Sequence, residues 1–207
     1  LALGYNQTNF ECGCSAESLR HFTTVSSSFY PELYDHYVKR GMAYYFNKDH
    51  TNKEATADFE TALKHMPESS AARLFLGDLY THAGRYSEAI AMLRKGLQHQ
   101  RIKQHIPMAL LAVLLAAAPE EKLRDGKEAL RLAKDSLKGT PPRYTSLKSL
   151  AAAHGELGDF KQALAALERI KKSEKMFQDH EETVKEMEAE FVAGRPWRLK
   201  VDEESEE

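Results

Sequence analysis

The longest uninterrupted apolar run in the chain extends from Met108 to Ala118 and contains no polar side chain. In an α-helix each residue rises about 1.5 Å, so this run spans roughly half of a ~30 Å hydrocarbon layer. A membrane-spanning helix is therefore not expected. The pattern predicts instead a helix that is apolar on every side, and such a helix has to be covered on more than one face.

Small residues recur along the chain at helical spacing. An alanine followed four positions later by a second apolar residue forms a motif that recurs at Ala55, Ala89, Ala129 and Ala163. These alanines are 34, 40 and 34 residues apart. Another small residue lies upstream of each motif, at Gly41, Gly77, Ala112 and Ala151. Small residues in consecutive helices let two backbones approach, while larger residues fill the space around the crossing. The period predicts repeated helix pairs, with turns at Gly84 and Gly158.

The segments Leu76-Gly77-x2-Tyr80 and Ala89-x3-Leu93 resemble the tetratricopeptide repeat, a helix-turn-helix unit of 34 residues. The stretches LLAVLLAAAPEEKLRDGKEALRLAKDSL, LAAAHGELGDFKQAL and FVAGRPWR further resemble a bacterial type of this repeat. The resemblance covers roughly residues 31 to 198. It implies an all-α fold, a right-handed α-solenoid of four helix pairs with a capping helix at each end.

The resemblance and the periodicity together define an expected domain organisation. We expect an N-terminal arm and capping helix over residues 1–30 and a C-terminal capping helix over 174–198, with Trp197 folded back onto it. Residues 199–207 read as an acidic disordered tail. The four repeats between the caps are expected at 31–69, 70–104, 105–142 and 143–173.

Charge and composition exclude some classes of function. The 29 Lys and Arg residues and the 31 Asp and Glu residues leave a formal net charge of −2, which is not the basic footprint of a nucleic-acid binder. The only cysteines are Cys12 and Cys14, with His21 as the nearest further donor, so four zinc ligands are lacking. We interpret them as ordinary arm cysteines or a strained local disulfide rather than a metal or redox site.

No catalytic constellation can be placed on a suitable element. The chain has no Ser-His-Asp order and no glycine-rich phosphate loop, and the nine histidines are scattered. His154 stands where the repeat usually has an aromatic residue, so we expect it to be packed and hydrogen-bonded. The sequence predicts a protein that is not an enzyme and that uses no cofactor or metal.

The first helix of each pair is expected to line the concave face of the solenoid. The repeat register places on this face Asp35, Val38, Met42, Tyr45, Leu74, Asp78, Thr81, Ile106, Ala109, Val113 and Lys148, together with Ala71, Ala116, Thr145, Ala152 and Gly155. Repeats that hold the carboxylate tails of heat-shock chaperones use Lys and Asn here. Val38 and Met42 occupy the corresponding places, so that specificity is not expected. A mostly apolar groove suits a helix or a hydrophobic peptide.

The leading hypothesis is a scaffold that binds an unidentified peptide or protein partner in this groove. The groove residues could instead pack against neighbouring repeats or a terminal arm, or form a homodimer contact. An alternative function is therefore a self-associating assembly protein, and a weaker one is a periplasmic or lumenal module whose Cys12-Gly-Cys14 arm binds metal or forms an intermolecular disulfide. We expect a soluble protein, cytoplasmic or, if a signal peptide preceded Leu1, periplasmic.

Overall fold

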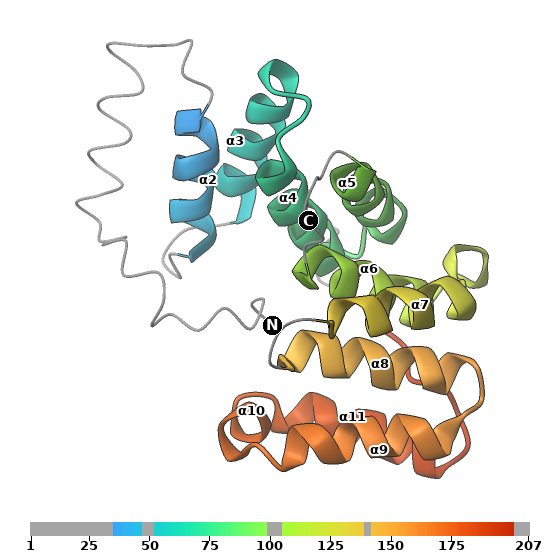
Figure 1. Ribbon diagram of the computed structural model, residues 1–207. Helices are drawn as coiled ribbons and strands as arrows, with labels where there is room; N and C mark the ends of the chain where they lie inside the picture. Colours follow the sequence, from blue (N-terminus) through green and yellow to red (C-terminus); the bar gives the residue numbers. More distant parts are fainter. Residues whose placement is uncertain (1–34, 47–51, 99–104, 139–141, 201–207) are drawn as a thin grey trace.

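The computed structural model describes residues 35–46, 52–98, 105–138 and 142–200. Every regular element within these ranges is a helix, which confirms the all-α prediction. Consecutive helices pack in pairs that follow one another along an extended array (Figure 1). The pairs are α2 (Asp35–Phe46) with α3 (Asn52–His65), α4 (Ser70–His82) with α5 (Tyr86–Gln98), α6 (His105–Ala117) with α7 (Gly126–Ser136), and α8 (Tyr144–Glu156) with α9 (Phe160–Lys171).

Some predicted features lie outside the described residues. These are the N-terminal arm and capping helix over 1–30, including Cys12 and Cys14, and the acidic residues that follow position 200.

The helix ends follow from local chemistry. Gly84 and Gly158 have φ of 70° and 77°, so both turns adopt the left-handed conformation expected of a helix-ending glycine. The side chains of Ser69, Asp125 and Asp159 accept hydrogen bonds from backbone N–H groups in the first turns of α4, α7 and α9. Each cap satisfies an N–H group that would otherwise lack a partner.

The small residues of the repeat pattern lie where two helices touch. A Cβ atom added at Gly77 of α4 would lie 2.9 Å from Cγ of Leu93 in α5, and Ala89 is completely buried beside it. The same holds in the first pair, where a Cβ at Gly41 would lie 2.9 Å from Cε1 of Phe59. The predicted close approach of paired helices is therefore present in both.

Helix α6 contains all of the apolar run except its last residue, Ala118, and every residue from Met108 to Ala118 is buried except the half-buried Leu110. It packs against α5, α7 and α8. Its C-terminal end is covered by a segment distant in the sequence, because the Leu199 N–H donates a 2.8 Å hydrogen bond to the Ala117 carbonyl. Among the described residues, no helix is both long and apolar enough to cross a membrane.

The C-terminal region departs from the single capping helix that the sequence predicts. It forms a short helix α10 (Glu174–Gln178), a longer helix α11 (Glu181–Val192), and then residues 193–200, which we name the C-terminal strap. Helix α11 packs against α9 and buries Val184, Met187 and Phe191. In Figure 1, α10 and α11 lie with α9 at the end of the array.

The strap also departs from the predicted tail. Residues 199 and 200 were expected to begin a solvated acidic segment, yet Leu199 is half-buried and bonded to α6. Tyr86 Oη donates a 2.7 Å hydrogen bond to the Lys200 carbonyl, which ties the same segment to α5. The strap therefore runs from α11 back across the repeats.

Candidate functional site

A pocket of about 830 Å³ lies between the inner helices α4, α6 and α8 on one side and the C-terminal region on the other. Its inner wall is formed by Asp78, Thr81, His82, Tyr86, Leu110, Val113, Leu114, Tyr144, Thr145 and Lys148. Its outer wall is formed by residues 178–183, Lys185 and Glu186 of the α10–α11 region and by Trp197, Leu199 and Lys200 of the strap. We name this space the strap pocket.

Lys148 is the cation of the inner wall. Its Nζ atom lies 5.0 Å from the centre of the Trp197 ring and 5.9 Å from that of Tyr144. Within the described residues no carboxylate oxygen lies within 4.0 Å of it, whereas Lys185 pairs with Glu181, and Lys200 also has a carboxylate partner on α11. Burial lowers the pKa of Lys148 to about 8, and the nearby carboxylates oppose this shift only in part. At neutral pH the site therefore holds a poorly hydrated ammonium between two aromatic rings.

The rings on this side of the pocket are uncharged at neutral pH. Tyr144 stacks on His180 with ring centres 3.5 Å apart. Burial raises the pKa of Tyr144 to about 12 and lowers the pKa of His180, because both charged forms are poorly solvated there. The pair forms a flat, neutral wall beside Lys148.

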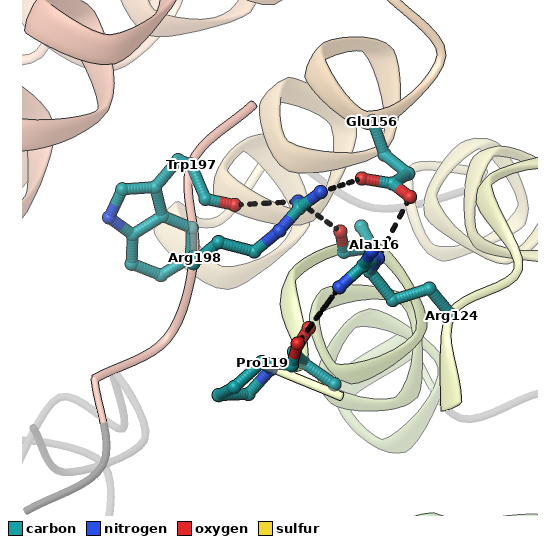
Figure 2. Close-up of polar contacts among 7 residues, drawn as sticks. Ala116, Pro119, Arg124, Glu156, Trp197 and Arg198 are labelled. Carbon is teal, nitrogen blue, oxygen red and sulfur yellow. Dashed lines mark hydrogen bonds and ion pairs between the residues drawn. The ribbon is translucent and has the colours of Figure 1, made fainter. Parts of the chain in front are cut away.

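The strap is held on the repeats by a network of polar contacts shown in Figure 2. Arg198 pairs with Glu156 at the end of α8 (Nη2 to Oε2, 2.7 Å) and donates a 3.2 Å hydrogen bond to the Ala116 carbonyl of α6. Glu156 also pairs with Arg124 (3.1 Å), which in turn donates to the Pro119 carbonyl (3.0 Å). One carboxylate thus joins the strap, α8 and the loop between α6 and α7.

Comparison with known proteins identifies the repeats. The sequence profile of the tetratricopeptide repeat family matches residues 48–101, a segment that includes α3, α4 and α5. The chain contains tetratricopeptide repeats. Such repeats imply a general role in protein interaction, and their fold is typically non-catalytic; no catalytic family is detected.

The fold also resembles a solved structure. The crystal structure of MamA superposes with a TM-score of 0.57 at 15% sequence identity, over 81% of this chain and 90% of that one. At this identity the likeness supports the fold and nothing more specific. No curated protein sequence matches the chain.

The tetratricopeptide register brings part of the predicted groove together. Asp78, Thr81, Val113, Thr145 and Lys148 line the strap pocket from three consecutive inner helices. A further predicted residue, Tyr45 of α2, donates a 2.5 Å hydrogen bond to Asp78 and so lies next to the pocket. These residues share one side of the array, as the repeat register requires.

Other predicted groove residues are placed differently. Asp35, Val38, Met42, Leu74, Ile106 and Ala109 do not line this pocket. Ala109 is 0% exposed, so its side chain offers no surface to a partner, and Val38 and Leu74 are also buried. Val38 and Leu74 belong to the closely packed apolar core of the helices.

The fourth repeat shows the largest difference from the expected groove. Ala152 and Gly155 are buried, and a Cβ atom at Gly155 would lie 2.3 Å from Cε1 of Phe191. Helix α11 therefore covers the end of the concave face that the sequence left open. The C-terminal strap likewise lies against the C-terminal end of α6, where Leu199 and Arg198 donate hydrogen bonds to the carbonyls of Ala117 and Ala116.

Several pocket residues were not identified from the sequence. Tyr86, Leu110, Leu114 and Tyr144 belong to the repeats, but the register assigned them no place on the groove. Trp197 and the other strap residues carry no helical periodicity that would place them against α6. The closing stretch FVAGRPWR was the one sequence feature in this region that we used, and it indicates the end of the repeats. It does not predict which helices the following residues contact.

Among the described residues, no group of three or more His, Cys, Asp or Glu side chains is arranged to hold a metal ion. His154, which we predicted to be packed, is half-buried and lies 3.5 Å from the Asp159 carboxylate.

Proposed function

We propose that this chain is a non-enzymatic interaction scaffold that binds an extended segment of a partner protein in the strap pocket. The observation that carries the proposal is the convergence of three inner helices and the C-terminal region on one pocket of about 830 Å³. Concave sites of this kind can bury most of a bound segment's surface. The general role of tetratricopeptide repeats in protein interaction supports the same reading.

The chemistry of the lining suits a peptide. The half-buried Leu110 is the most exposed residue of an apolar floor that the edges of the buried Val113 and Leu114 complete, and this floor can hold aliphatic or aromatic side chains. The hydroxyl groups of Thr81 and Thr145 lie beside this floor and can hydrogen-bond to a peptide backbone. An apolar floor with a few polar groups around it is the usual anatomy of a protein recognition site.

The test is differential capture by the full chain. Thr145 is half-exposed on the inner wall, so Thr145→Arg places a long charged side chain in the pocket with little effect on the core. The matched control is Thr61→Arg, which makes the same change at a half-exposed threonine of α3 outside the pocket. Proteins captured from native lysate are identified by quantitative mass spectrometry for each variant.

We expect Thr145→Arg to lose partners that the unaltered chain and Thr61→Arg retain. If both variants capture the same set, the strap pocket is not the binding site. If the only protein that responds to the change is the chain itself, the self-associating assembly hypothesis replaces the scaffold.

A further inference from the structure

The strap lies on the repeats as a bound peptide would. Its Leu199 N–H donates to the Ala117 carbonyl, and its Lys200 carbonyl accepts from Tyr86. Carbonyl groups in the last turn of a helix have no partner within the helix. The strap therefore donates a hydrogen bond to a carbonyl at the end of α6. The backbone N–H of any extended segment in the same position could make the same bond.

The strap side chains occupy separate places on this surface. Trp197 is only 7% exposed and lies beside the ammonium group of Lys148. Arg198 reaches the opposite side, where it pairs with Glu156 and caps the Ala116 carbonyl (Figure 2). We name the surface that receives Trp197 and Arg198 the strap seat.

The strap is anchored independently at one end. Residues 193–195 between α11 and the seat are exposed, and the side chain of Arg195 pairs with Glu190 of α11 rather than with the repeats. Helix α11 is held by its own buried residues Val184, Met187 and Phe191. Release of the strap from its seat therefore does not require α11 to leave α9.

We propose that the strap seat is a peptide-recognition subsite whose resident ligand is the strap, and that a partner segment with an aromatic residue directly followed by arginine displaces it. This inference rests on the proposed function, because it specifies the segment that the groove accepts. The short tether gives the strap an effective concentration in the millimolar range, so only a well-matched partner segment competes with it.

The seat explains why these two residue types are required. A ring next to Lys148 gains a cation–π contact that an aliphatic side chain lacks. An arginine can pair with the Glu156 carboxylate and still donate to the Ala116 carbonyl, as Arg198 does. A segment without it leaves a helix-end carbonyl and part of a half-buried carboxylate without donors, which disfavours binding.

The experiment uses the single tryptophan of the chain, Trp197. In the full-length variant Trp197→Ala/Arg198→Ala the strap is weakened and the protein contains no tryptophan. The probe is the synthetic peptide Gly-Arg-Pro-Trp-Arg-Leu-Lys, so that its indole is the only one in the mixture. We expect its emission to shift to the blue as the ring becomes buried.

Two matched controls define the specificity. The variant Trp197→Phe is also free of tryptophan but keeps an aromatic-arginine strap, so it should bind the same peptide at least roughly tenfold more weakly. A peptide with alanine in place of its second arginine should bind the weakened variant roughly tenfold more weakly, as expected from loss of a charge-assisted contact.

The results of this peptide experiment and of the capture experiment test the two proposals separately. If the weakened variant retains its helical circular dichroism and the peptide shows no shift at about 1 mM, the strap seat is not a peptide subsite. Should this variant not fold, the unaltered chain is titrated with Gly-Arg-Pro-Phe-Arg-Leu-Lys up to about 10 mM, which exceeds the effective concentration of the tethered strap, and an unchanged Trp197 emission overturns the proposal. Loss of partners in Thr145→Arg with no peptide binding would leave the proposed function intact and remove only this inference.

Discussion

Gly155 of α8 lies directly against Phe191 of α11, which makes Gly155→Ala an informative perturbation. The new Cβ would lie 2.3 Å from Cε1 and 2.9 Å from Cζ of Phe191. Carbon atoms in good contact are about 3.5–4.0 Å apart, so the ring would have to retreat by more than an ångström. Phe191 is only 2% exposed, and the close packing of a protein interior leaves such a ring little room to move.

The magnitude follows from two opposing effects. Replacing a glycine by alanine within a helix favours folding by about 1 kcal/mol, because alanine has less backbone freedom to lose. Inserting a methyl group into a packed core costs about 1–3 kcal/mol. At a contact this short we expect the upper part of that range, and thus a net loss of about 1–2 kcal/mol in the free energy of unfolding.

The assay is urea denaturation followed by circular dichroism, with Trp197 emission as a second probe of the strap. The matched control is Gly96→Ala in α5, where the new Cβ would lie 3.4 Å from Cβ of Arg73 and needs no rearrangement. That variant should be about 0.5–1 kcal/mol more stable than the unaltered chain. Adding Phe191→Ala to Gly155→Ala should destabilise by less than the sum of the two single changes, because the methyl group partly fills the cavity.

One result would refute the reasoning. If Gly155→Ala is as stable as Gly96→Ala and Trp197 emission is unchanged, Phe191 does not pack over Gly155, and α11 does not cover the fourth repeat in the way described.

Two further predictions concern charges. In the folded protein burial lowers the pKa of Lys148 to about 8 from its ordinary value of 10.5, so above pH 8 the unfolded chain binds more protons and stability rises with pH. The free energy of unfolding relative to the variant Lys148→Met should therefore increase between pH 8 and pH 10.5 and stay level below pH 8; a difference independent of pH would contradict the burial of Lys148. Arg40→Ala removes the bidentate partner of the buried Asp58 carboxylate (2.6 and 2.7 Å) and should destabilise the α2–α3 pair by about 3 kcal/mol. Hydrogen exchange should speed up in α2 and α3 before it does in α8 and α9, and uniform exchange across the repeats would count against this pairing.

Much of the repeat architecture could be predicted because the residues that contact one another are close together in the sequence. Gly77 meets Leu93 within one helix pair, so the spacing of small and large residues carries the information needed to pack that pair. The same register defined one side of the array, and the structure brings Asp78, Thr81, Val113 and Lys148 of that side to one pocket. A period of about one helix pair thus places residues from different repeats on a common face.

What covers that face could not be predicted, because the answer depends on contacts between distant segments. Leu199 bonds to Ala117 and Arg198 to Ala116, although neither strap residue lies in a periodic element. Whether an irregular segment reaches α6 depends on how all the stacked helices are oriented. It also depends on the direction in which the chain leaves the end of α11. The sequence by itself determined that α6 needs cover on both sides, since exposing the apolar side chains of such a helix to water is unfavourable. Only the tertiary structure decided that the chain's own strap contributes to that cover, and that the pocket beside it contains a poorly hydrated lysine and a buried tryptophan.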